Sequence, residues 1–171
     1  MTEATGGDRV TERRVGIVVG SRSDIAAAEK AAAVLDELGV ASEIRVISAH
    51  RAPELLARFV STAEDRGIRV VIAIAGLAAH LPGVVASQTT LPVIGVPMAG
   101  GVSDGLDALL AIVQMPKGVP VATVGVGNGE NAGLLAAAIL AVSDPALRER
   151  LVARRVTQAE AIAADEANEG L

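Results

Sequence analysis

The chain has 171 residues and a net charge of −5 at pH 7, with 51 % hydrophobic and 20 % charged residues. This balance is typical of a globular protein, and the low pI near 5.0, without any basic stripe, argues against nucleic-acid binding. Because cysteine is absent, disulfides and thiolate metal ligands are excluded.

The length favours one domain over residues 1–171, with 1–13 as a flexible N-terminus. The first residues are polar and lack the apolar stretch of a signal peptide, and the most apolar region, 70–86, is interrupted by Gly76, His80 and Pro82. We therefore expect no membrane helix and a cytoplasmic location.

The mean hydropathy of +0.47 predicts burial of apolar surface between subunits. The alternative is that the abundance of alanine alone raises this value.

Short apolar runs alternate along the chain with segments of helical periodicity. The predicted strands are 14–19, 42–47, 69–75, 93–96 and 119–124. The predicted helices are 23–38, 53–66, 80–88, 106–113, 128–142 and 145–164, the last after the start signal Asp144-Pro145. Runs of Val and Ile without alternation are typical of strands buried on both faces. The alternation therefore predicts an α/β fold, a three-layer α/β/α sandwich with a central parallel sheet.

The segment Gly20-Ser-Arg-Ser-Asp24 joins the first strand to the first helix. The carboxyl ends of parallel strands are where ligands bind in such folds, and a helix N-terminus attracts anions. Ser21 and Ser23 are candidate donors to a phosphate, and Asp24 is a candidate acceptor for ribose hydroxyls. The alternative is that Ser23 or Asp24 only caps the helix.

The segment Ser48-Ala-His50-Arg51 follows the second strand in the same way. Arg51 offers the forked donor set that suits a phosphate, and an imidazole can give or take a proton near neutral pH. Alternatively, Arg51 pairs with a surface carboxylate and His50 caps a helix, although Pro53 already marks that helix start.

The segment Ala75-Gly76-Leu77-Ala-Ala-His80 follows the third strand and consists mostly of small side chains. Such a loop lets the backbone approach a planar ligand or a small gas-like molecule. His80 alone is equally compatible with a buried structural histidine. Two histidines without a third suitable ligand do not predict a metal site.

The glycine-rich segment 96–107 follows the fourth predicted strand. It suits either a mobile cover over the strand ends or an ordinary surface loop.

Several of these motifs occur together, in the same order, in one family. They are Gly20-Ser-x-Ser-Asp24, Ser48-Ala-His-Arg51, Ala78-Ala-His-Leu-Pro-Gly83, Gly105-x-Asp107, Val113-Gln-Met-Pro116 and Gly118-x-Pro-Val-Ala-Thr123. The chain resembles the N5-carboxyaminoimidazole ribonucleotide (N5-CAIR) mutases of purine biosynthesis, the PurE family, over about residues 15–151.

The resemblance implies a flavodoxin-like subunit in a homo-octamer that isomerises N5-CAIR to 4-carboxyaminoimidazole ribonucleotide (CAIR) without cofactor, metal or ATP. The carboxylate leaves as CO2, is retained, and rejoins the ring at C4. The resemblance assigns the catalytic residues as His50 and His80. It assigns substrate binding to Ser21, Ser23, Asp24, Ser48, Ala49, Arg51, Ala75, Gly76 and Leu77.

The chain departs from this family near the base and CO2 region. The family usually reads Gly-Ala-Gly-Gly-Ala-Ala-His where this chain has Ile74-Ala-Gly-Leu77-Ala-Ala-His80, and Ser103, Asp104 and Ala108 also differ. Two alternatives therefore stand beside the mutase. One is a direct carboxylase of aminoimidazole ribonucleotide or of another heteroaromatic nucleotide. The other is a nucleotide sensor without catalysis, which the two retained histidines disfavour.

Overall fold

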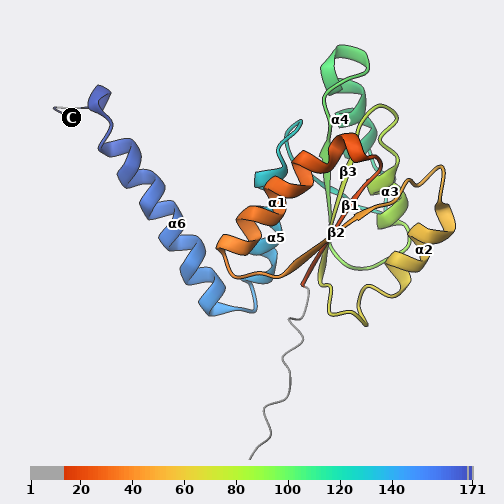
Figure 1. Ribbon diagram of the computed structural model, residues 1–171, viewed down its shortest axis with the longest axis horizontal. Helices are drawn as coiled ribbons and strands as arrows, with labels where there is room; N and C mark the ends of the chain where they lie inside the picture. The colour runs from red at the N-terminus through yellow and green to blue at the C-terminus, as the bar shows by residue number, and fades with distance from the viewer. Residues whose placement is uncertain (1–13, 169, 171) are drawn as a thin grey trace, which may run out of the picture.

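The computed structural model describes residues 14–168 and 170, so the predicted flexible segment 1–13 lies outside the described residues. Five parallel strands form one sheet in the order β2-β1-β3-β4-β5. The strands are β1 (Val15–Val19), β2 (Ser42–Val46), β3 (Val70–Ala75), β4 (Val93–Pro97) and β5 (Ala122–Thr123). This is the strand order of flavodoxin-like folds, and the prediction of a parallel α/β sandwich is confirmed (Figure 1).

Helices cover both faces of this sheet. The helices are α1 (Ile25–Glu37), α2 (Pro53–Ser61), α3 (Leu81–Ala86), α4 (Leu106–Val113), α5 (Gly129–Leu140) and α6 (Pro145–Ala163), with short 3-10 turns η1 (Arg22–Asp24), η2 (Val102–Gly105) and η3 (Glu166–Asn168). Helices α1 and α5 pack on one face, and α2, α3 and α4 pack on the other. The projecting helix α6 continues outside this sandwich (Figure 1).

The two apolar cores are separated by the sheet and use alternate strand residues. Ile17 and Ile72 belong to the core beneath α1 and α5, whereas Val18 and Ala73 belong to the core beneath α2 and α3. Every residue of β1, β3 and β4 is buried. Central parallel strands are covered on both faces, which explains why their sequences are continuous apolar runs.

Helices α1 and α5 approach each other closely because α5 carries glycine at the contact. A β-carbon on Gly133 would lie 2.4 Å from Cγ1 of Val34 and 2.7 Å from the carbonyl oxygen of Ala31. A β-carbon on Gly129 would lie 2.0 Å from the carbonyl oxygen of Ala27. Residues without a side chain are therefore required at these two positions.

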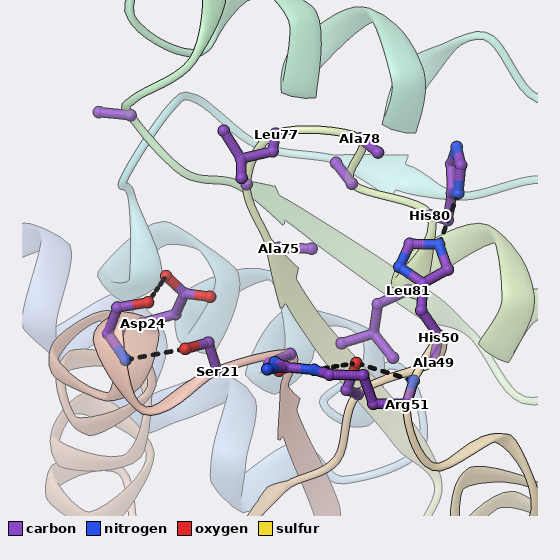
Figure 2. Close-up of a pocket in the computed structure, with 16 residues that line it drawn as sticks. Ser21, Asp24, Ala49, His50, Arg51, Ala75, Leu77, Ala78, His80 and Leu81 are labelled. Carbon is purple, nitrogen blue, oxygen red and sulfur yellow. Dashed lines mark hydrogen bonds between the residues drawn. The ribbon is translucent and has the colours of Figure 1, made fainter.

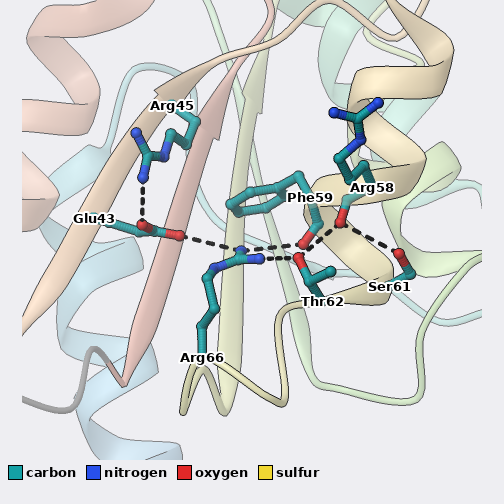
Figure 3. A network of polar contacts seen from close by, with 7 residues as sticks. All are labelled: Glu43, Arg45, Arg58, Phe59, Ser61, Thr62 and Arg66. Atoms are coloured by element: carbon teal, nitrogen blue, oxygen red, sulfur yellow. Dashed lines mark hydrogen bonds and ion pairs between the residues drawn. The ribbon is translucent and has the colours of Figure 1, made fainter.

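A buried carboxylate ties the edge strand β2 to the end of α2 (Figure 3). Glu43 accepts from Nη2 of Arg45 at 2.9 Å and from Nη2 of Arg66 at 3.2 Å. Arg66 also donates to the Phe59 carbonyl and lies over the Phe59 ring, 5.0 Å from its centroid. Charge-assisted bonds of this kind fix the position of α2 relative to β2, and hence the connection between them.

Helix α6 is attached to the rest of the chain by the buried Leu147 and by several polar contacts. Asp144 caps the helix by accepting from the Leu147 amide, and it pairs with Nη1 of Arg14 at 2.8 Å. The Arg14 hydrogen bond, followed by that of the Leu147 amide, holds the pKa of Asp144 below its usual value. Arg154 bridges Glu37 and Glu130 at 2.5 and 2.7 Å.

Two predicted elements are shorter in the structure by four residues or more. The predicted strand 119–124 is reduced to β5, because Pro120 has no amide hydrogen and an edge strand has one neighbour only. The predicted helix 53–66 ends at Ser61 and continues as turns up to Gly67, which has φ +84°. The predicted helix 106–113 has the observed bounds of α4.

Candidate functional site

A pocket of about 560 Å³ opens at the carboxyl ends of the strands, where the loops after β1, β2, β3 and β4 meet. In the strand order, β2 and β3 lie on opposite sides of β1. The connections that leave β1 and β3 therefore diverge to opposite faces of the sheet, which leaves a crevice between them. Three of the apolar runs are followed by small or polar residues, Gly20, Ser48 and Gly76, at which the chain turns away from the sheet.

The loop after β1 forms one wall of this pocket (Figure 2). Oγ of Ser21 accepts from the Ser23 amide at 3.4 Å, and Oγ of Ser23 donates to Oδ1 of Asp24 at 3.0 Å. Asp24 is the N-cap residue of α1, yet its side chain makes no capping hydrogen bond. The alternative that Ser23 or Asp24 serves only as the cap of α1 is therefore not supported, and all three side chains line the pocket.

Arg51 spans from the loop after β2 to the loop after β1. Its Nε lies 3.3 Å from Oγ of Ser48, and its Nη2 lies 3.3 Å from the carbonyl oxygen of Gly20. Figure 2 shows the guanidinium lying across the same end of the pocket as Ser21. These two partners are neutral oxygens, and no carboxylate of residues 14–168 forms an ion pair with the guanidinium. The arrangement provides two hydroxyls and one cation for an anionic group.

The two imidazoles lie together at the other side of the pocket (Figure 2). Nε2 of His50 is 2.8 Å from Nδ1 of His80, and the rings meet edge to face with centroids 5.0 Å apart. His50 comes from the loop after β2, and His80 immediately precedes α3. Both residues are exposed. His80 is thus a pocket residue and not the buried structural histidine of the alternative interpretation.

The loop after β3 supplies the floor of small side chains between these two groups. Ala75 lies near the centre of the pocket in Figure 2, and the loop closes with a hydrogen bond from the Ala79 amide to the Gly76 carbonyl at 3.0 Å. Leu77 and Ala79 have positive φ angles of 57° and 43°. These are values that residues with a β-carbon rarely adopt. The loop is therefore held in a strained conformation against the pocket.

Every residue that the sequence analysis assigned to the site lines this one pocket. These are Ser21, Ser23, Asp24, Ser48, Ala49, His50, Arg51, Ala75, Gly76, Leu77 and His80. Five further lining residues were not assigned, namely Gly20, Ala78, Ala79, Leu81 and Ala99. Four of them stand inside motifs already singled out, and Ala99 stands in the glycine-rich segment 96–107. Only their position within or near a motif could have predicted them, because their side chains have no polar or ionisable group.

Within residues 14–168 and 170, no three His, Asp or Glu side chains are grouped as metal ligands. Over the same part of the chain, no helix has the length and apolar character needed to span a bilayer.

Comparison with known proteins gives concordant results from sequence and structure. The AIR carboxylase family matches residues 14–161. The N5-carboxyaminoimidazole ribonucleotide mutase of Mycobacterium tuberculosis is 53 % identical over 154 residues, which cover 90 % of this chain and 88 % of that protein. The phosphoribosylaminoimidazole carboxylase of Schizosaccharomyces pombe is 54 % identical over 82 % of this chain, but the match covers 25 % of that protein. The crystal structure of Treponema denticola PurE superposes with a TM-score of 0.83 at 30 % identity, covering 92 % of this chain and 98 % of that one.

Proposed function

Because the chain belongs to the AIR carboxylase family, we propose that it is an N5-CAIR mutase, an isomerase that converts N5-CAIR to CAIR in purine biosynthesis. Relatives that carry this name match about nine tenths of the chain. The observation that carries the proposal is the composition of one pocket. It combines an anion-binding end at Ser21 and Arg51 with a hydrogen-bonded imidazole pair, His50 and His80.

In this proposal the substrate phosphate lies against Ser21, Ser23 and Arg51. A planar guanidinium with two nearby hydroxyls matches the three oxygens of a phosphate, and the start of α1 adds a favourable dipole. Asp24 then accepts hydrogen bonds from the ribose hydroxyls. Ser48 orients Arg51 through the contact between its Oγ and Nε of the guanidinium.

The ring of the substrate lies over the loop 75–80, next to His50. A protonated imidazole delivers its proton to the exocyclic nitrogen as the bond from that nitrogen to the carboxylate carbon breaks, which releases CO2 and leaves aminoimidazole ribonucleotide. C4 of the ring then attacks CO2, and the neutral imidazole removes the C4 proton to restore aromaticity. The proton returns to the group that gave it, so the net reaction is an isomerisation. His80 takes part through its hydrogen bond to His50.

Retention of CO2 requires that water and gas exchange be restricted during the reaction. His50 and His80 are exposed in the isolated chain, so the cover must come from a loop movement or from another subunit. Ala99, in the glycine-rich segment 96–107, already lines the pocket. This segment is the part of the chain best placed to close over a bound substrate.

The proposal includes assembly into a homo-octamer, as the family resemblance implies. In support of this assembly, two helices carry exposed apolar residues. They are Val152, Val156 and Ile162 on α6 and Leu106 and Leu110 on α4, which are 45–67 % exposed. Apolar side chains at such density on two helices mark surfaces that are covered by other protein. The proposal also places the enzyme in the cytoplasm, since a phosphorylated sugar does not cross a bilayer unaided.

A second candidate is direct carboxylation of aminoimidazole ribonucleotide. It is favoured by the 54 % identity to the Schizosaccharomyces pombe protein named phosphoribosylaminoimidazole carboxylase. That protein is much longer than this chain, so its name also covers segments that have no counterpart here. The pocket chemistry at C4 is common to both reactions, and they differ in the source of CO2.

An assay with two alternative substrates separates these functions. The purified protein receives either N5-CAIR or aminoimidazole ribonucleotide with bicarbonate, and CAIR is measured by its absorbance. We expect turnover of N5-CAIR at low bicarbonate, and no turnover above background for the His50→Asn variant. Rapid turnover of aminoimidazole ribonucleotide with bicarbonate, together with no turnover of N5-CAIR, would contradict the mutase and support the carboxylase.

A further inference from the structure

Leu77 stands out among the residues of the pocket floor. Its neighbours Ala75, Gly76 and Ala78 carry at most a methyl group, whereas Leu77 carries a branched side chain that is 65 % exposed and lines the pocket. Its φ of 57° places it in the left-handed region, which is unfavourable for a leucine and free of cost for a glycine. A strained residue of this kind persists where its surroundings hold it in place.

The surroundings that hold Leu77 belong to the cover loop, which we define as residues 99–105. A β-carbon on Gly101 would lie 3.1 Å from Cδ2 of Leu77, so the leucine side chain packs directly on the backbone of that loop. The same β-carbon would lie 2.5 Å from Oδ2 of Asp107. Gly101 therefore lies between the side chains of Leu77 and Asp107, and its φ of 70° is a backbone conformation that favours glycine.

The cover loop is in turn fixed by two carboxylates. Oδ2 of Asp107 accepts from the Val102 amide at 3.1 Å, and Oδ1 of Asp104 accepts from the Gly100 amide at 3.3 Å. The buried Oδ1 of Asp107 has no partner among the described residues. These bonds hold the backbone on which the leucine side chain packs.

Leu77 also lies at a defined end of the pocket. Figure 2 shows Ser21 and Arg51 at one end, Ala75 between, and Leu77 at the opposite end. A nucleotide anchored by its phosphate at Arg51 extends its base toward Leu77. This placement of the base rests on the proposed function.

We propose that Leu77, supported by Gly101 of the cover loop, is a specificity-determining wall that limits the base of the bound ribonucleotide to a single five-membered ring. A fused two-ring base needs additional length in the direction occupied by the leucine side chain. Replacement of that side chain by hydrogen opens this space, whereas the phosphate and ribose contacts stay as they are.

The test compares binding of two ribonucleoside monophosphates by calorimetry. The probes are 5-aminoimidazole ribonucleotide, with one ring, and inosine 5′-monophosphate, with two fused rings. For Leu77→Gly we expect inosine monophosphate to bind about 10-fold tighter or better, which is the discrimination a small apolar pocket provides. We expect a smaller change in the affinity for aminoimidazole ribonucleotide, so that the ratio of the two dissociation constants shifts toward inosine monophosphate. Glycine suits the positive φ at this position, so this variant is expected to fold.

Two further variants sharpen the comparison. Leu77→Met keeps a large apolar side chain, and we expect the ratio of its affinities for the two probes to stay close to that of the unmodified protein. Leu55→Ala removes an exposed leucine on α2, away from the pocket, and serves as the control for loss of apolar surface. An equal increase in affinity for both probes in Leu77→Gly, or no increase for inosine monophosphate, would contradict the proposed role of Leu77 in limiting the base. If the unmodified protein binds no aminoimidazole ribonucleotide, both the wall and the proposed function fail.

Discussion

Nε2 of His50 and Nδ1 of His80 face each other at 2.8 Å, with the two rings nearly perpendicular. Two N–H groups cannot point at each other along this line, so one nitrogen donates and the other accepts. The remaining nitrogens, Nδ1 of His50 and Nε2 of His80, are the atoms available to a ligand. The pair therefore offers an imidazole whose tautomer is set by its neighbour, which is a common arrangement for proton transfer.

The first prediction concerns the His50 side chain. For His50→Asn we expect kcat to fall by about 10²- to 10⁴-fold, the usual contribution of a general acid and base, with little change in the affinity for aminoimidazole ribonucleotide. His80→Asn retains an amide that can still bond to His50, and its loss of kcat is expected to be smaller. Steady-state kinetics combined with calorimetry measures both effects. Loss of binding with unchanged turnover per occupied site would assign His50 to anchoring instead.

The second prediction concerns the anion-binding end of the pocket. A charge-assisted hydrogen bond contributes about 1.5–3 kcal/mol, so Arg51→Ala is expected to raise KM by roughly 10- to 150-fold with a smaller change in kcat. Arg58→Ala, which removes an exposed arginine on α2 outside the pocket, is the matched control. An unchanged KM in Arg51→Ala would exclude this arginine from the phosphate site.

The third prediction concerns the contact between α1 and α5. Gly133→Ala places a β-carbon against Val34 and the Ala31 carbonyl, and overpacking of this kind destabilises by about 1–3 kcal/mol. Thermal unfolding at fixed protein concentration measures the effect. Ala138→Ser changes an exposed residue of the same helix, and we expect its midpoint to stay close to that of the unmodified protein. Equal midpoints for the two variants would show that the helices can move apart at no cost.

The fourth prediction concerns the pH dependence of the α6 attachment. Because the folded-state pKa of Asp144 is lowered, first by the Arg14 hydrogen bond, its stabilising contribution is present above the unfolded pKa. That contribution is lost as the pH falls through the folded pKa. The gap in Tm between the unmodified protein and Asp144→Asn should be largest from pH 7 to about 5 and should shrink on further acidification. A gap that widens in acid would contradict this assignment.

The fifth prediction concerns assembly through α6. Val152 and Val156 are four residues apart and therefore share one face of the helix, and both are exposed. If α6 takes part in the proposed octamer, Val156→Asp is expected to shift sedimentation toward smaller species, because a charge is introduced into an apolar contact. Thr157→Asp adds the same charge one position along, on a different face, and is expected to leave the assembly intact. If the unmodified protein, Val156→Asp and Thr157→Asp sediment alike, this face of α6 is excluded from the subunit contacts.

The sequence predicted the layers and the central strands because both rest on continuous apolar runs. β1, β3 and β4 are recognisable as they are buried on both faces. The edges were harder to predict, since β5 has only one neighbouring strand and its extent depends on pairing rather than on composition. The end of α2 depends on Arg66 folding back to Glu43, a contact 23 residues distant that no local pattern reveals. The resemblance to the PurE family was confirmed by the comparisons.

The sequence could predict that the site residues lie near one another, because the carboxyl ends of parallel strands meet at one edge of the sheet. It could not predict the contacts between their side chains. The sequence placed His50 and His80 at two strand ends, but a hydrogen bond between them depends on side-chain rotamers. The positive φ of Leu77 was also unpredictable, because leucine is rarely found in that region. The roles of the site residues stay predictions until the variants above are measured.

The two ends of the pocket share only one connection. The loop after β1 carries Ser21 and Asp24 of the anchoring end, the loops after β3 and β4 border the reacting end, and the loop after β2 contributes Arg51 to the first and His50 to the second. Changes in the loops after β3 and β4 can accumulate while the loop after β1 keeps its shape, because each loop is supported by its own strand. In the proposed function, a lineage with this scaffold can thus change its reaction through substitutions in two loops while the phosphate contacts are retained.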